Sequence, residues 1–287
     1  MQSKKIHPWI LVAMAASAIF TFYAQAQAPD GKVHVWFLDV GQGDAIFIET
    51  PSGQQILVDG GPDNSVVQEL GKVMPFWDKT IDLVVMTHPD ADHLNGLPEV
   101  LKRYEVESVL ETGVECSTSQ CESWRGLIKE KGIEKYIAKF GQTIDMGDGV
   151  QLFVFNPIES KEGESVSKKN NTSVVIKVVY GEQSLLLTGD IEGRVESKLV
   201  LAGLDINSDF LKIAHHGSKT SSTREFLDAV SPAIAFISAG TKNRYGHPTQ
   251  EVLNRLENDD IKYYRTDLSG TIELTLDNNN YSINFIK

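Results

Sequence analysis

The chain alternates short runs of apolar, largely β-branched residues with amphipathic segments. Short apolar runs are typical of buried strands, and apolar residues spaced three and four apart are typical of helices. Strands are predicted at residues 33–40, 45–49, 55–58, 83–86, 150–155, 173–179, 184–187, 210–214, 234–238, 271–276 and 281–285. Helices are predicted at residues 94–103, 124–131, 192–201, 223–229 and 249–257.

The order of these elements indicates the fold class. Many strands in mixed order, interrupted by single helices, favour an α/β architecture of packed sheets with helices outside. The polar stretch at residues 161–171 contains mostly Lys, Glu, Ser and Asn and is interpreted as a mobile loop. No internal repeat or clear linker divides the chain, so a single domain is expected.

The N-terminus has the pattern of an export signal. Two lysines at residues 4–5 precede an apolar run at residues 9–23, and Ala24-Gln25-Ala26 has the small residues that signal peptidase reads. Cleavage is expected after Ala26, because cleavage two residues later would place Pro29 directly beyond the scissile bond. An uncleaved anchor is the alternative, although the run is short for a full span. We therefore expect a signal peptide at 1–26 and a mature domain at 27–287 without stable membrane insertion, in the periplasm or secreted.

Composition and charge exclude several function classes. With 41% hydrophobic and 23% charged residues, the chain has ordinary globular usage, which excludes disordered and fibrous proteins. The 27 basic and 39 acidic residues give a formal charge of −12. A protein that binds nucleic acid through a broad basic surface has the opposite balance. Binding of a polyanion would therefore need bound cations or a small basic patch.

The two cysteines lie close together in the segment CSTSQC, as Cys116 and Cys121. In an oxidising compartment a local disulfide is the favoured interpretation. Metal binding by the pair is the weaker alternative, because two thiolates alone do not complete a zinc site.

The strongest chemical signal is THPDADH, which follows the apolar strand ending at Met86. It places His88, Asp90, Asp92 and His93 within six residues. Imidazole nitrogens and carboxylate oxygens suit zinc, manganese or iron. In an extended segment His88 and Asp90 point to the same side, and the following turn presents the other two, so the segment favours two metals. An acidic surface turn and a calcium loop are the alternatives, but the ligand register of an EF-hand is missing.

Four other segments that follow apolar strands carry acids or imidazoles. They are VDGG with Asp59, LLLTGD with Asp190, AHHGS with His215 and His216, and the later YGHP with His247. Each alone is more often structural than functional. Together they predict a cluster of acids and imidazoles at one edge of a sheet.

The order of these motifs resembles the metallo-β-lactamase superfamily. Within it, the chain is similar to the hydrolase domain of ComEC-type competence proteins, which also carry segments like DVGQGD at 39–44 and YRTDLSGTI at 264–272. The similarity extends from about residue 33 to residue 272. It implies a four-layer αββα sandwich with two divalent ions, zinc or manganese, at the upper edge of the two sheets.

The resemblance also implies a role for each site residue. His88 and Asp90 would hold one metal; Asp92, His93 and His216 would hold the other, and Asp190 would bridge them. Asp59 would orient a ligand histidine by accepting its free N–H. Either of His215 and His216 remains a candidate ligand; His216 is preferred because His-Gly is the commoner form of the motif.

Two departures from the superfamily bear on the first metal. Its usual HxHxDH is here HxDxDH, so Asp90 replaces an imidazole and favours harder ions such as manganese. The histidine before the LLLTGD strand is absent, and Asn171 in that region could supply only a weak oxygen ligand. A single bound ion therefore remains an alternative to two.

These residues predict an exported metal-dependent hydrolase, most simply a phosphodiesterase that uses a metal-bound hydroxide. The resemblance to ComEC-type domains implies DNA as its substrate. Asp92, with Asp190, would hold the nucleophile in line, and His215 or His247 would protonate the leaving oxygen. Ser218 and Lys219 would hold a phosphate. The turn at residues 41–44 is either a plain hairpin or a substrate contact.

Other functions remain open. A phosphorylcholine-type esterase on cell-surface polymers shares the HxDxDH and HHG pattern. A non-catalytic module assisting DNA uptake is the alternative outside enzymes. β-Lactam hydrolysis is disfavoured because imidazoles are missing, and a channel is excluded because there is no membrane-spanning bundle. The sequence does not identify protein partners.

Overall fold

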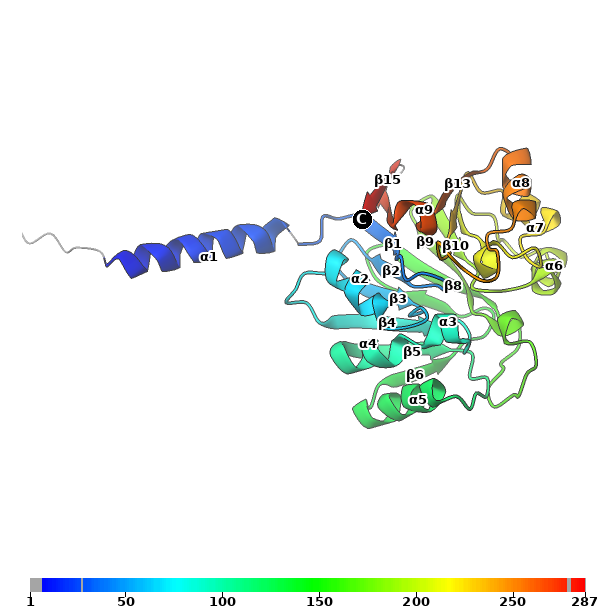
Figure 1. Ribbon diagram of the computed structural model, residues 1–287, viewed down its shortest axis with the longest axis horizontal. Helices are drawn as coiled ribbons and strands as arrows, with labels where there is room; N and C mark the ends of the chain where they lie inside the picture. The colour runs from blue at the N-terminus through cyan, green and yellow to red at the C-terminus, as the bar shows by residue number, and fades with distance from the viewer. Residues whose placement is uncertain (1–6, 27, 278–279, 287) are drawn as a thin grey trace, which may run out of the picture.

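The structure, a computed structural model, describes residues 7–26, 28–277 and 280–286. Two mixed sheets pack face to face, and helices cover the outer face of each (Figure 1). This is the four-layer αββα sandwich that the sequence predicted, so the fold prediction is confirmed.

The first sheet has eight strands in the order β15-β14-β1-β2-β3-β4-β5-β6. The bounds of its strands are β1 Val33–Phe37, β2 Ile46–Glu49, β3 Gln55–Val58, β4 Thr80–Met86, β5 Glu105–Glu111, β6 Glu134–Ile137, β14 Thr271–Asp277 and β15 Asn280–Ile286. Strands β3 to β6 run parallel to one another, and the other pairs are antiparallel.

The second sheet has seven strands in the order β13-β12-β11-β10-β9-β8-β7. The bounds of its strands are β7 Thr143–Asp145, β8 Val150–Asn156, β9 Val175–Tyr180, β10 Gln183–Leu187, β11 Phe210–Lys212, β12 Ile234–Ile237 and β13 Lys262–Arg265. Strands β10 to β13 are parallel. Each sheet therefore contains a parallel half whose carboxyl ends meet at one edge, which is where ligands bind in such sheets.

The helices are α1 Pro8–Ala26, α2 Ser65–Val73, α3 Ala91–Leu94, α4 Leu97–Arg103, α5 Ser119–Lys131, α6 Gly193–Leu201, α7 Arg224–Val230, α8 Gln250–Asn258 and α9 Thr266–Ser269. Two 3₁₀ turns, Lys169–Thr172 and Ala214–Gly217, lie beside the sheet edge discussed below. The first of them ends the polar stretch at residues 161–171; its mobility stays a prediction.

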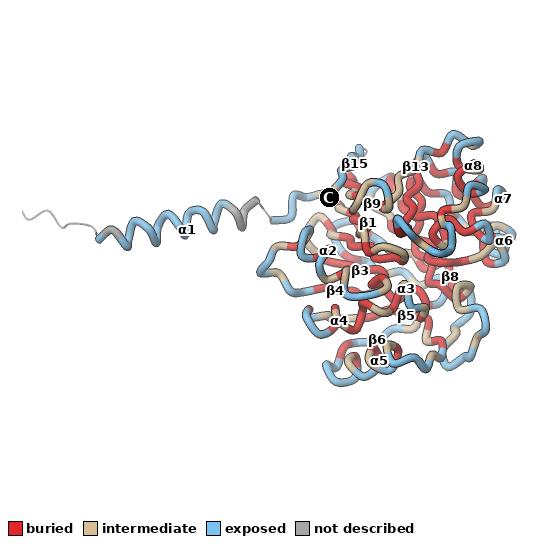
Figure 2. Tube along the Cα trace, viewed as in Figure 1, coloured by how far each residue is buried: buried red, intermediate tan, exposed pale blue. Residues whose placement is uncertain are grey.

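Three apolar clusters hold the layers together. The central one lies between the sheets, where the rings of Phe37 and Phe236 stack with centroids 4.2 Å apart. The second lies under α2, α4 and α5, and the third under α6, α7 and α8. Figure 2 shows these buried layers between exposed helix faces. Burial of apolar side chains on both faces of each sheet explains why most strands read as nearly continuous apolar runs.

The N-terminal segment projects from this sandwich as α1, which Figure 1 shows extending away from the sheets. Among the described residues, no helix is both long and apolar enough to cross a bilayer. Residues 1–6 with the two lysines, and Gln27 at the expected start of the mature chain, lie outside the described residues. Signal cleavage and export therefore stay predictions.

The local disulfide predicted from sequence is present. Cys116 and Cys121 are joined at the start of α5, with their Cα atoms 6.0 Å apart. The metal-binding alternative for this pair is therefore wrong.

The single helix predicted at residues 94–103 is instead two helices, α3 and α4, separated by Asn95 and Gly96. Gly96 lies against the backbone of another loop: a Cβ placed on it would lie 2.0 Å from the carbonyl oxygen of Gly60 and 2.5 Å from that of Asp63. The chain must pass this point without a side chain, and the helix is interrupted there.

We expect Gly96→Ala to lower the free energy of unfolding by about 1–3 kcal/mol, because the backbone must shift to relieve the overlap. Gly126→Ala is the matched control: Gly126 is exposed inside α5, and a Cβ at this position would have no neighbour within 4 Å, so a gain of about 0.5–1 kcal/mol is expected. Urea unfolding of both variants measures the difference, and equal stabilities would contradict the close approach.

Candidate metal centre

The candidate centre forms where parallel strands of the two sheets end side by side. From the first sheet, β3 leads into Asp59, and β4 leads into His88 and then α3, which carries Asp92 and His93. From the second sheet, β10 leads into Asp190 and β11 into the 3₁₀ turn with His215 and His216. The parallel pairing of β3 with β4, and of β10 with β11, aligns the strand ends within each sheet. Contacts of Asp190 with His93 show that the ends of the two sheets meet.

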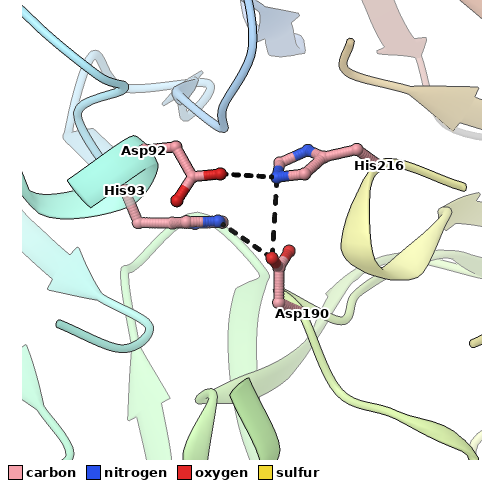
Figure 3. Close-up of side chains that lie close together, drawn as sticks. All are labelled: Asp92, His93, Asp190 and His216. Atoms are coloured by element: carbon pink, nitrogen blue, oxygen red, sulfur yellow. Dashed lines mark ion pairs between the residues drawn. The ribbon is translucent and has the colours of Figure 1, made fainter. Parts of the chain in front are cut away.

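The following four side chains converge into one cluster: Asp92, His93, Asp190 and His216 (Figure 3). One ligand atom from each lies within 4.8 Å of all the others. The Nε2 atoms of His93 and His216 lie 3.3 and 3.5 Å from the Asp190 Oδ2, and the His216 Nε2 lies 3.3 Å from the Asp92 Oδ2. Two carboxylates and two imidazoles at these separations are a donor set that suits a divalent cation.

The Nδ1 atom of each imidazole is held by the protein on the side away from the cluster. His93 Nδ1 lies 2.7 Å from the Asp59 Oδ2, and His216 Nδ1 lies 3.1 Å from the Ser238 carbonyl oxygen. Both partners accept, so each Nδ1 carries a hydrogen, and each Nε2 faces the cluster. The contact between Asp59 and a ligand histidine is the one that the resemblance implied.

His88 is oriented in the same way by two hydroxyl groups. Its Nδ1 lies 3.1 Å from the Thr87 Oγ1 and 3.3 Å from the Ser173 Oγ. Those hydroxyls donate their own hydrogens to Asp59 and to the Asn170 carbonyl oxygen, so they accept from His88. The Nε2 atom of His88 is therefore the free one.

The atoms that make no hydrogen bond indicate what the centre can hold. The Nε2 atoms of His88, His93 and His216 and the Oδ1 of Asp190 are buried and make no hydrogen bond. Buried polar atoms that make no hydrogen bond are rare because each costs about 1–3 kcal/mol. Here the Nε2 atoms of His93 and His216 have only the ion pairs with Asp190 and Asp92. His93, Asp190 and His216 belong to the four-residue cluster and His88 lies beside it, so cations bound at this centre would use these atoms, and the residues fit a metal.

The electrostatics of the cluster come from opposite charges in a buried space. Burial opposes charge on His93 and His216, but Asp190 and a second carboxylate raise the pKa of both, that of His216 to about 10. Burial likewise opposes charge on Asp190, yet the neighbouring imidazoles hold its pKa well below the usual range. Burial together with the nearby charge of His93 lowers the pKa of His88 to about 3, so His88 is neutral.

These pKa shifts predict that metal affinity rises with pH. A ligand nitrogen must lose its proton, so binding to the charged His93 and His216 displaces protons, and affinity should rise about tenfold per pH unit for each proton displaced. The pKa of an unperturbed histidine is 6.5, and that of His216 is raised to about 10. In the metal-free protein the ion pairs of His216 are therefore intact below pH 6.5 and are lost as the pH rises toward about 10. Competition with a chromophoric chelator from pH 6 to 9 measures this slope, and a flat profile would contradict it.

His88 and Asp90, the ligands expected for the first metal, lie beside the four-residue cluster but are not part of it. The Asp90 Oδ2 is 3.7 Å from the His88 Nε2, and its Oδ1 is 3.6 Å from the Lys169 Nζ. Burial raises the pKa of Asp90 above its usual value although Lys169 opposes this. The structure thus brings these two ligands close together, with the lysine competing for the carboxylate.

Asn171 is not available as the weak oxygen ligand considered from sequence, and that prediction is wrong. Its Oδ1 accepts from the Glu192 N–H at 3.1 Å and its Nδ2 donates to the Glu192 carboxylate at 2.7 Å. The neighbouring Asn170 faces the centre instead, with its Nδ2 3.2 Å from the His215 Nε2. One residue along a 3₁₀ turn changes which side chain faces the site.

The backbone explains why His216 rather than His215 enters the cluster. Both residues have left-handed backbone angles, with φ of 52° and 54°, which costs about 1–2 kcal/mol for each non-glycine residue. This turn buries His216 among the carboxylates and leaves His215 partly exposed, 3.8 Å from the Asp190 Oδ2. Such strain is characteristic of functional sites.

A cavity of about 210 Å³ opens over the cluster. It is lined by Gln42, Asp90, Asp92, Asn170, Asp190, His215, His216, Tyr245 and His247. His215 and His247, the predicted proton donors, lie here with ring centroids 5.6 Å apart. Burial and the charge of His215 lower the pKa of His247 to about 4, which makes His247 a poor proton donor near pH 7.

Ser218 and Lys219, predicted to hold a phosphate, do not line this cavity. Ser218 is buried, and its hydroxyl lies 3.0 Å from that of Thr220. The tight turn after His216 satisfies that hydroxyl locally, so we correct the assignment of Ser218. Lys219 is exposed, and its role stays a prediction.

Sequence reasoning missed a buried pair of charges beneath the centre. The Lys212 Nζ lies 2.9 Å from the Asp44 Oδ1, both side chains are almost fully buried, and that oxygen is 3.3 Å from the His216 Nδ1. Asp44 closes the DVGQGD segment, and a lysine within the apolar strand β11 was the available signal for its partner.

Comparison with known proteins gives consistent matches. Residues 38–241 match the family described as the Metallo-beta-lactamase superfamily. The chain is 33% identical over 261 residues to ComE operon protein 3 of Bacillus subtilis (strain 168), covering 85% of this chain and 33% of that protein. It is 31% identical over 281 residues to competence protein ComA of Neisseria gonorrhoeae, covering 94% of this chain and 36% of that protein.

The chain thus spans about a third of the length of these curated relatives. Among solved structures, the metallo-beta-lactamase fold protein YhfI from Bacillus subtilis has a TM-score of 0.57 at 10% identity, covering 84% of this chain and 99% of that one. At this identity the likeness concerns the fold alone.

Proposed function

The chain belongs to the metallo-β-lactamase superfamily, and on that premise we propose that it is a metal-dependent phosphodiesterase with DNA as its substrate. The coarser statement, a metal-dependent hydrolase, follows from the family and the candidate metal centre. The observation that carries the proposal is a set of buried imidazole nitrogens and a carboxylate oxygen that make no hydrogen bond and lie beside an open cavity.

Each residue of the centre has a role in this proposal. Asp92, His93, Asp190 and His216 would hold one cation, and His88 with Asp90 would contribute to a second one beside Asp190. When bound, divalent cations lower the pKa of water and offset negative charge on phosphoryl oxygens. Zinc or manganese is proposed, and Asp90 in place of an imidazole favours the harder ion.

His215 is proposed as the group that protonates the leaving oxygen. It is partly exposed in the cavity wall, and its Nε2 lies 3.8 Å from the Asp190 Oδ2. An imidazole suits proton transfer near neutral pH. The low pKa of His247 supports His215 over His247 for this step.

The choice of DNA rests on the relatives and on local charge. Two of the relatives are named for competence or its operon, and competence is the uptake of DNA. The chain carries a net charge of −12, so a polyanion would be held locally. Two cations lie beside residues that line the cavity. Lys169 pairs with Asp90, and the Arg244 guanidinium lies 4.9 Å from the Tyr245 ring centroid.

Export to an oxidising compartment is part of the proposal. The disulfide between Cys116 and Cys121 is typical of such compartments. The positively charged and apolar start of the chain supports the same location.

The test is hydrolysis of bis-p-nitrophenyl phosphate, and of labelled single- and double-stranded DNA, by protein reloaded with manganese or zinc. We expect turnover that a chelator abolishes and added metal restores. p-Nitrophenyl phosphorylcholine is assayed in parallel, because a preference for it would support the esterase alternative. If the folded, metal-loaded protein hydrolyses neither bis-p-nitrophenyl phosphate nor DNA, the proposal is overturned.

A further inference from the structure

Gln42 belongs to the loop between β1 and β2, yet it lines the cavity over the metal centre. The loop is packed tightly against the segment that carries Asp92. The Asp44 N–H donates to the Asp92 carbonyl oxygen at 3.2 Å, and a Cβ on Gly43 would lie 2.2 Å from that same oxygen. Gln42 is therefore presented from a rigid support that also holds a metal ligand.

One hydrogen bond fixes the orientation of the Gln42 side-chain amide. The Oε1 atom accepts from the Gly240 N–H at 3.1 Å. A backbone N–H cannot accept, so this end of the amide is the oxygen and the other end is the NH₂ group. The loop also lies close to Gly240: a Cβ placed on Gly240 would lie 2.8 Å from the backbone nitrogen of Gln42.

The Nε2 atom of Gln42 is buried and makes no hydrogen bond. An unpaired buried donor costs about 1–3 kcal/mol, so it needs an explanation. The acids of the cavity wall, Asp90, Asp92 and Asp190, do not pair with it. Gln42 thus carries an unsatisfied donor and belongs to a wall that otherwise presents mainly carboxylates and imidazoles.

Phosphoryl oxygens are acceptors, so they need donors or cations and are repelled by carboxylates. We propose that Gln42 binds the substrate by donating from Nε2 to a non-bridging phosphoryl oxygen. The proposal rests on the proposed phosphodiesterase function and extends it by a substrate-binding residue. Because the loop is rigid, this donor needs little reorganisation when charge develops on that oxygen.

The test compares Gln42→Ala and Gln42→Glu with the exposed control Gln68→Ala in α2. For bis-p-nitrophenyl phosphate, Gln42→Ala should lower kcat/KM by about 10²-fold, the loss typical of one such donor. Gln42→Glu should lower it further, because it replaces the donor with a negative charge. Bound metal, measured by elemental analysis, should equal that of the wild type, and Gln68→Ala should change neither quantity.

Binding of inorganic phosphate to the metal-loaded protein, measured by calorimetry, gives a readout independent of turnover. Gln42→Ala should weaken it by about tenfold or more, as expected for a hydrogen bond to a charged group. Wild-type protein that binds phosphate but hydrolyses neither bis-p-nitrophenyl phosphate nor DNA would overturn the proposed function. The inference about Gln42 would still be supported in that case if Gln42→Ala binds phosphate more weakly.

Three results would overturn the inference about Gln42. They are unchanged phosphate affinity and kcat/KM in Gln42→Ala, a loss of activity accompanied by an equal loss of metal, and wild-type protein that binds no phosphate. The second result would mean that the loop supports Asp92 rather than the substrate.

Discussion

Asp190→Asn is expected to abolish metal-dependent hydrolysis, with a fall in kcat/KM on the order of 10³-fold, the upper end for loss of one charge-stabilising group. Asp190 is almost fully buried, and its Oδ2 lies 3.3, 3.5 and 3.8 Å from the Nε2 atoms of His93, His216 and His215. No other carboxylate in the described part of the chain lies within ion-pair distance of all three imidazoles. Asparagine keeps the size of the side chain and removes its charge.

The metal content of the same variant provides a second measurement. The cluster loses the carboxylate that lies within ion-pair distance of His93, His215 and His216, so bound metal should fall together with activity. Asp205→Asn is the matched control, since the Asp205 side chain is 84% exposed and pairs with Lys177 away from the cavity. If Asp190→Asn kept its metal and stayed within about tenfold of wild-type activity, the assignment of Asp190 would be wrong.

Lys212→Met is expected to lower the free energy of unfolding by about 3–5 kcal/mol, which is the usual cost of removing one partner of a buried ion pair. Lys212 is fully buried, with its Nζ 2.9 Å from the Asp44 Oδ1 and 3.0 Å from the Ile213 carbonyl oxygen. Methionine leaves the Asp44 carboxylate buried without its closest cation. Since whole domains are stable by about 5–15 kcal/mol, this is a large fraction.

Urea unfolding of the metal-free protein at pH 7 measures this loss. Lys102→Met is the control, because Lys102 is half exposed and its pair with Glu99 should contribute less than about 1 kcal/mol. Adding Asp44→Asn to Lys212→Met should recover part of the stability, since neither charge is then left alone. An equal cost of Lys212→Met in both backgrounds would show that the two charges are not coupled.

The sequence predicted most of the strands because their apolar runs are buried on both faces. It missed β6 (Glu134–Ile137) and β13 (Lys262–Arg265), which are edge strands of the two sheets. Their residues are exposed or partly exposed, and several of them are charged. Edge strands commonly carry such residues, and apolar periodicity cannot reveal them. β5 (Glu105–Glu111) was missed for a related reason, since only its last three residues are buried.

The candidate site was predictable where a ligand follows an apolar strand directly. Asp59, His88 and Asp190 are of this kind, because the ends of parallel strands meet at one edge wherever the intervening loops go. Residues presented by turns were less predictable. Asn170 rather than Asn171, and the satisfied hydroxyl of Ser218, depend on local hydrogen bonds that spacing does not specify.

By itself, the sequence determined the family, the layered fold and the types of ligand available, because apolar patterning and the order of the motifs can be read along the chain. Only the tertiary structure decided which ligands share one cluster, which of His215 and His216 is buried in it, and that Asp44, Lys212 and Gln42 belong to its surroundings. The physical reason is that these contacts join loops from two different sheets. Their distances are set by how the sheets pack, and no spacing along the chain encodes that packing directly.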